Sequence, residues 1–153
     1  MADAEVKVER ILLASEGRPF SDAAIARVLE LARPNEASVR VLSIARVHGT
    51  SFGMPTPGLL PTKKEWAEQR DIVAKAIKRL KKKGLDADGH VIGTRAATKK
   101  ICAEAKLSSC DVIVMGADRD RFRLIGDMHW EQEPQRVRRK AKIPVYLVQE
   151  DEG

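Results

Sequence analysis

Five short apolar runs constrain the fold of this chain more than any other feature of its sequence. Each run is rich in valine, isoleucine or leucine, and they cover residues 10–15, 38–44, 90–92 with their flanks, 111–115 and 144–148. Runs such as ILLA and VIVM are apolar at consecutive positions, which is typical of strands buried on both faces. The pattern therefore predicts a parallel sheet, with the fourth strand ending in a turn at Gly116.

Segments with helical periodicity separate these runs. They cover residues 22–33, 63–83, 98–105 and 134–140. Ser21 is placed to cap the first helix, and Pro134 suits the first turn of the last. The order is strand, helix, strand throughout. Because such crossovers are right-handed, we predict a doubly wound, mostly parallel five-stranded sheet with helices on both faces, a Rossmann-like α/β fold.

Length and composition fit one globular domain over residues 1–153. Hydrophobic residues make up 43% of the chain and charged residues 33%, as expected for a packed core with a solvated surface. The sequence has neither a membrane-length apolar run nor the apolar core of a signal peptide, so we expect a cytoplasmic protein. Cys102 and Cys110 lack the spacing of a metal site, and we interpret both as buried apolar residues.

Charge is concentrated in two places. Five bases between Lys78 and Lys83 precede Gly84, as expected at the end of a helix. A second basic stretch runs from Arg119 to Lys142, close to a predicted strand end. In doubly wound sheets ligands bind beyond the carboxyl ends of the strands. The long connections 45–62 and 116–133 therefore mark the edge where we expect a binding site.

Three sequence segments carry a resemblance to a known family. They are ILLASEGRPFS at residues 11–21, CDVIVMGADRDR at 110–121 and IPVYLV at 143–148. In this order they resemble the first, fourth and last strands of the universal stress protein family. The resemblance covers most of the chain. It implies a sheet like that of the adenine-nucleotide alpha-hydrolases and a role in the stress response.

The resemblance also implies where a nucleotide would bind. In the nucleotide-binding branch of the family, the fourth strand enters the pattern G-x2-G-x9-G-[ST], whose glycine amides approach phosphate. Gly116 matches the first glycine, but Arg119 occupies the second position. The nearest substitute for the third is Gly126, which is followed by Asp127 instead of a hydroxyl. We therefore expect a degenerate phosphate site.

The same alignment gives the remaining candidate residues. Glu16 replaces the aspartate at the end of the first strand. Ile44 takes the position after the second strand whose backbone, as the resemblance implies, faces adenine, with Met115 opposite it in an apolar slot. Our principal hypothesis is a non-catalytic binding or adaptor protein of the stress response. The alternative is a functional adenine-nucleotide (ATP) binder, in which Arg119 and its neighbours replace the glycine amides. No catalytic or metal residues are predicted, although a weak ATPase remains open.

Partners and minor functions follow from the remaining features. The last strand, from Pro144 to Val148, is expected at a sheet edge, which favours a homodimer. The stretch from Gly126 to Pro134 is longer than usual in the family and contains Trp130, which fits either a protein contact surface or a side chain folded back over the pocket edge or onto the core. No membrane partner is expected.

Nucleic acid is disfavoured because aromatic residues make up only 4% of the chain. A serine hydrolase is disfavoured because prolines follow the G-x-S-x-G match at residues 49–53.

Overall fold

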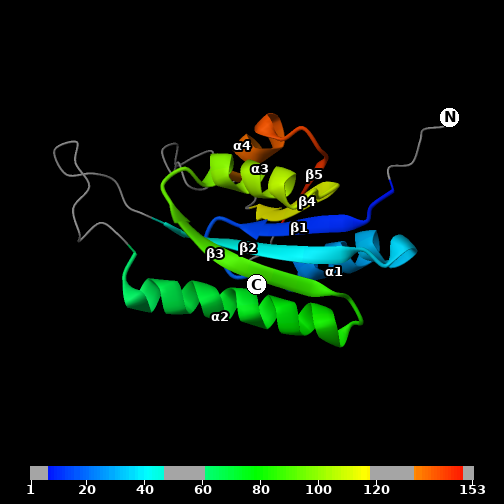
Figure 1. Cartoon of the computed structure of the whole chain (residues 1–153), viewed down its shortest axis with the longest axis horizontal. Coiled ribbons are helices and arrows are strands. Elements are labelled where there is room, and N and C mark those ends of the chain that lie inside the picture. The colour runs from blue at the N-terminus through cyan, green and yellow to red at the C-terminus, as the bar shows by residue number, and fades with distance from the viewer. Residues whose placement is uncertain (1–6, 47–60, 118–132, 150–153) are drawn as a thin grey trace.

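The computed structural model describes residues 7–46, 61–117 and 133–149, in which strands and helices alternate (Figure 1). The strands are β1 (Arg10–Ser15), β2 (Ser38–Arg46), β3 (Ala87–Thr94), β4 (Val112–Ala117) and β5 (Val145–Gln149). The helices are α1 (Asp22–Ala32), the 3-10 turn η1 (Arg33–Asn35), α2 (Lys63–Lys82), α3 (Ala97–Leu107) and α4 (Glu133–Lys140). Every predicted strand and helix is present.

The five strands form one parallel sheet in the order β3-β2-β1-β4-β5. The chain builds outward from β1 to β3 on one side, and then returns to place β4 against the free side of β1. The strand order thus reverses between β1 and β4, whose register pairs Leu12 with Ile113 and Ala14 with Met115. The sheet confirms the doubly wound prediction and places the ligand edge at the carboxyl ends of β1 and β4.

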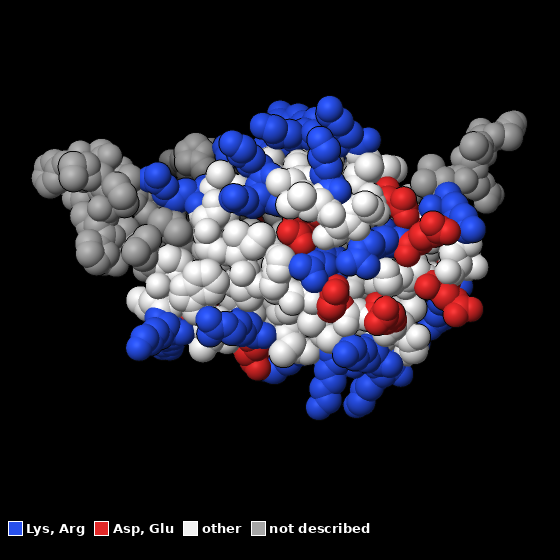
Figure 2. All heavy atoms as spheres, in the orientation of Figure 1, with Lys and Arg blue, Asp and Glu red and all other residues white. Residues whose placement is uncertain are grey.

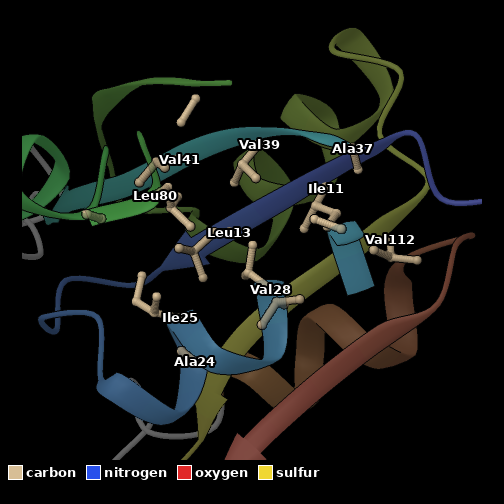
Figure 3. Close-up of a cluster of buried hydrophobic side chains, with 14 of the residues drawn as sticks. Ile11, Leu13, Ala24, Ile25, Val28, Ala37, Val39, Val41, Leu80 and Val112 are labelled. Atoms are coloured by element: carbon tan, nitrogen blue, oxygen red, sulfur yellow. The ribbon is translucent and has the colours of Figure 1, made fainter. Parts of the chain in front are cut away.

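Alternation along β1 divides the core into two layers, because successive side chains of a strand point to opposite faces. Ile11 and Leu13 pack with α1 and α2 on one face, in the cluster shown in Figure 3. Leu12 and Ala14 pack with α3 and α4 on the other face. All four side chains are at most 1% exposed. This double burial explains why the strand sequence is apolar without interruption.

Caps at the helix ends match the sequence signals. The Ser21 hydroxyl accepts a hydrogen bond from the Ala24 amide at 3.0 Å, and Thr62 with Glu65 forms a reciprocal capping box at the start of α2. At the end of α2, Gly84 has φ +89°. The Gly84 and Leu85 amides donate to the Lys81 and Leu80 carbonyls, a Schellman motif. The basic cluster before Gly84 is therefore a helix end, as predicted.

Several boundaries and burial predictions need correction. β2 continues two residues past Ile44, and β4 continues through Gly116 to Ala117 because β5 pairs with both residues. The strand therefore does not end in a turn at Gly116. The central strands are buried on both faces, whereas β3 and β5 are partly exposed because they are the sheet edges.

The two cysteines also differ from one another. Cys110 is buried as expected, and burial raises the pKa of its thiol to about 11. Cys102 is only partly buried. The prediction of a buried apolar residue is thus confirmed for Cys110 and wrong for Cys102. No helix in the described ranges has the length and apolarity needed to cross a membrane.

Candidate functional site

A tight turn follows β1 at the point where the strand order reverses. The Ser15 hydroxyl donates a hydrogen bond to the Arg18 carbonyl at 2.6 Å and accepts one from the Gly17 amide at 3.0 Å. Gly17 has φ +133°, a conformation that side chains disfavour. A Cβ atom at Gly17 would also lie 3.4 Å from the Ile44 carbonyl oxygen. Glycine therefore lets this turn lie directly against β2.

The turn buries Glu16 and pairs it with Arg18. The Glu16 side chain is 3% exposed and that of Arg18 is 16% exposed. Arg18 Nε donates to Glu16 Oε1 at 3.1 Å, and Arg18 Nη2 donates to Oε2 at 3.0 Å. This bidentate pair compensates for the burial of the carboxylate. The acid that the family resemblance places at the ligand edge is thus held by an arginine of its own turn.

A polar chain connects the turn to α2. The Ser43 hydroxyl, which is fully buried in β2, donates to the Gln69 side-chain oxygen. Gln69 Nε2 then donates to the Gly17 carbonyl at 3.0 Å. Neither side chain was among the residues predicted from the sequence. The signal that was present is Ser43 itself, a single hydroxyl in an otherwise apolar strand segment, since a buried hydroxyl requires a partner.

The other candidate residues within the described ranges lie in the sheet itself. Ile44 and Met115 are both 0% exposed and belong to the core cluster with α3 and α4. Ile44 lies within β2 instead of after it, and β1 lies between the two strands. Gly116 is partly buried and pairs with Val148 of β5. The structure therefore brings these residues to one edge, but the Ile44 and Met115 side chains offer no surface to a base.

The remaining candidates fall in the segments that are not described. These are Arg119, Gly126 and Asp127, and likewise the G-x-S-x-G match at residues 49–53 and residues 126–132 of the expected contact surface. The end of that surface is described, because α4 begins at Glu133 and Pro134 is buried.

A second buried carboxylate, also missed by the sequence analysis, lies on α3. Glu104 Oε2 accepts hydrogen bonds from Arg40 Nε of β2 at 3.0 Å and from the Ser108 hydroxyl at 3.1 Å. Arg40 Nη2 lies 2.9 Å from His90 Nδ1, and Arg40 Nη1 lies 3.2 Å from Asp88. Because arginine only donates, His90 accepts through Nδ1. Its other ring nitrogen, Nε2, lies 3.4 Å from Glu104 Oε1.

Opposing effects determine the pKa values in this cluster. Burial favours the neutral form of Glu104, but the hydrogen bond from Arg40, with smaller contributions from His90 and Ser108, lowers the pKa of the carboxyl below its ordinary value. Burial likewise opposes the charge on Arg40, yet its hydrogen bonds to Glu104 and Asp88 raise the pKa of the guanidinium. Both groups are therefore charged at neutral pH, as a mutually compensated pair.

Comparisons with known proteins agree with this architecture. A model of the universal stress protein family matches residues 7–149. No curated protein matches the chain significantly by sequence. A universal stress protein family structure from Burkholderia pseudomallei is similar with a TM-score of 0.69 and 19% identity, over 95% of this chain and 98% of that one.

Two similar structures were solved with adenine nucleotides. The universal stress protein from Archaeoglobus fulgidus in complex with dAMP has a TM-score of 0.65 and 18% identity, over 93% of this chain and 98% of that one. An Arabidopsis thaliana family protein with AMP bound has a TM-score of 0.58 and 15% identity, over 94% and 92%. The TM-scores of these structures establish the shared fold. The family model spans nearly the whole sequence and shows that this chain belongs to the universal stress protein family.

Proposed function

We propose that this chain is a non-catalytic universal stress protein that acts as a binding or adaptor protein in the stress response, with a nucleotide site too altered to hold ATP in the family manner. The ion pair between Glu16 and Arg18 carries this proposal. Both carboxylate oxygens already accept hydrogen bonds from the guanidinium. A nucleotide that used Glu16 as an acceptor would have to compete with Arg18 for a carboxylate that is only 3% exposed.

Two further observations support the altered site. The Ile44 and Met115 side chains lie wholly in the core, so neither provides apolar surface for an adenine ring. In the sequence, Arg119 stands where the family pattern has its second glycine, and Asp127 stands where it has a hydroxyl. A carboxylate repels phosphate, and a side chain at a glycine position keeps the backbone at a distance.

Calorimetry with ATP and magnesium tests the proposal directly. We expect no binding heat from the wild-type chain. Arg18→Ala frees the Glu16 carboxylate, so we expect this variant to show measurable heat of ATP binding. Arg27→Ala is the matched control, because it breaks an arginine–glutamate pair on the exposed side of α1, away from the ligand edge. A micromolar dissociation constant for the wild-type protein would contradict the proposal.

An adenine-nucleotide binder is the second candidate. It is favoured by the place of Glu16, Gly17 and Gln69 at the point where the strand order reverses, and by the adenine nucleotides bound in the two similar structures. If this candidate is correct, wild-type protein binds ATP, and Glu16→Gln weakens binding by at least about tenfold through the loss of a charged acceptor. Glu30→Gln, the control in an exposed pair, should leave the affinity unchanged.

A homodimer through β5 is part of the principal proposal. β5 lies at one edge of the sheet, and its residues from Val145 to Val148 are only partly buried. Leu147 and Val148 also line a cavity of 630 Å³ against α1, where Leu29 contributes further apolar surface. An unpaired apolar edge favours association with a second strand.

Light scattering tests the dimer. We expect a mass of about twice the 17.0 kDa of the chain. Val148→Lys should produce a monomer, because it places a charge on the edge strand. Leu107→Lys changes an 81% exposed leucine on α3 and is the control that should remain dimeric. A monomeric mass for the wild-type protein would refute the dimer.

A further inference from the structure

Helices α3 and α4 form a strongly basic surface on one side of the sheet. Residues 95–107 and 133–142 contain nine basic and two acidic residues, a balance of +7, whereas the whole chain carries +6. In Figure 2 the basic side chains gather above the sheet, where Figure 1 places α3 and α4. We name this surface the α3–α4 basic face. Its members are Arg95, Lys99, Lys100, Lys106, Arg136, Arg138, Arg139, Lys140 and Lys142.

Among the described residues, four cations of this face have no acid beside them. Glu104 is buried and held by Arg40, so it faces the sheet instead of the solvent. In the described part of the chain, Lys99, Lys100, Arg138 and Arg139 have no carboxylate partner. On helix α2, by comparison, two of the cations are paired, Lys75 with Asp71 and Arg79 with Asp22. These four side chains of the α3–α4 basic face therefore carry positive charge without an acidic partner among the described residues.

The surroundings of these cations indicate the chemistry of the partner. Ile101, Ala105 and Val137, the apolar residues of the two helices, are buried against the sheet, and Leu107 is the large hydrophobic residue left exposed in the described ranges. Helices that bind membranes present an apolar face to the lipid, and protein interfaces need a buried apolar centre. A phosphate backbone needs only lysine and arginine.

We propose that the α3–α4 basic face binds the phosphate backbone of double-stranded nucleic acid without recognising its sequence. The earlier expectation against nucleic acid rested on the shortage of aromatic residues, which matter for stacking on unpaired bases. A duplex keeps its bases paired, and contacts to its backbone require no stacking. Helix α3 also adds cations that lie outside the basic stretch recognised in the sequence. The proposal does not depend on the nucleotide site.

A salt titration with a short mixed-sequence DNA duplex, followed by fluorescence anisotropy, tests the proposal. The test variant replaces Lys99, Lys100, Arg138 and Arg139 with glutamine. The matched control removes the same charge at the end of α2, by replacing Lys78, Lys81, Lys82 and the C-cap residue Lys83 with glutamine. We expect the test variant to lose at least about tenfold in affinity. The plot of log affinity against log salt has a negative slope, and its magnitude should decrease by about 3 to 4 in the test variant. The slope of the control should change little.

Several outcomes would overturn the proposal. They are the absence of binding at about 50 mM salt, equal losses in the test variant and the control, and binding to phosphatidylserine vesicles or to a polyglutamate peptide but not to the duplex. Should the fourfold variant fail to fold, the pair Lys100→Gln and Arg139→Gln serves instead. The magnitude of its salt slope should then decrease by about 2. An unchanged slope would equally refute the proposal.

Discussion

Glu16 and Glu104 are both buried carboxylates held by arginine, yet they are built into the molecule in different ways. Glu16 is 3% exposed and pairs with Arg18, two residues further along the same turn. Glu104 is 7% exposed and pairs with Arg40, which lies 64 residues away on another element. The first pair is local to one turn. The second connects a helix to the middle of the sheet.

This difference separates a group available for function from one required by the fold. Both residues of the Glu16 pair lie in one turn at the ligand edge, so the pair joins no two elements of the fold. The Glu104 pair joins α3 to β2, while Asp88 and His90 of β3 also contact Arg40. Its rupture leaves a partly buried guanidinium without its main acceptor. We therefore expect substitutions at Glu104 to affect mainly stability, and substitutions near Glu16 to affect mainly binding.

The largest effect is expected from Glu104→Gln. The substitution preserves shape but removes the charge that compensates Arg40, so the free energy of unfolding should fall by about 2 to 3 kcal/mol. Urea unfolding at pH 7 measures it. Glu30→Gln is the control, because that carboxylate is exposed in its pair with Arg27 and should change stability by less than about 0.5 kcal/mol. Equal effects in the two variants would remove the distinction between the pairs.

The pH dependence of stability gives the next prediction. Because the folded state lowers the pKa of Glu104 below its ordinary value of 4.5, the unfolded chain binds this proton more readily. The stabilisation by Glu104 is therefore complete above about pH 5 and declines as the pH falls through the folded-state pKa. Wild-type stability should fall more steeply than that of Glu104→Gln on acidification. Parallel unfolding curves from about pH 5 to pH 3 would contradict this.

The same two carboxylates show what the sequence could and could not predict. The positions of the strands and helices followed from apolar runs and caps, because these signals lie within a few residues of one another. Glu16 was identified because the family resemblance aligns it with the aspartate that ends the first strand. Its partner Arg18 and the link from Ser43 through Gln69 to Gly17 depend on how the turn and α2 meet. Such contacts between distant elements leave no local pattern in the sequence.

The Glu104 cluster was missed for the same reason. On α3, Glu104 has the spacing of the buried face, seven residues after Ala97 and three after Ile101, but no local signal indicates the cation that meets it there. Arg40 in turn alternates with valines within β2. Only the register that pairs Arg40 with Asp88, together with the packing of α3 over β2, brings these charges together. Likewise, Ile44 was expected after β2. The strand extends beyond it because β3 provides partners up to Thr94.

A smaller effect is expected from Arg18→Ala. Arg18 lies in a partly exposed turn, so water can reach Glu16 when the guanidinium is removed. We expect a loss of about 1 kcal/mol in the free energy of unfolding, less than that for Glu104→Gln. Chemical denaturation of both variants under the same conditions makes the comparison. A loss as large as that of Glu104→Gln would show that the Glu16 pair is as important to the fold as the long-range pair.

The smallest effect concerns the turns next to the two carboxylates. Gly17 follows Glu16 with φ +133°, and Ser109 follows the end of the helix that carries Glu104, with φ +53°. Ser109 closes a Schellman motif, since its amide and that of Cys110 donate to the Lys106 and Ala105 carbonyls. A left-handed conformation strains serine but not glycine.

Ser109→Gly should therefore raise the free energy of unfolding by about 0.5 kcal/mol, as measured by thermal or urea unfolding. Ala103→Gly is the control, because it introduces the same residue into the exposed side of α3, where helical geometry makes glycine costly by about 1 kcal/mol. Opposite signs for the two substitutions would show that the turn after α3 is strained. A loss of stability in both would mean that the serine is better suited to this turn than its backbone angle indicates.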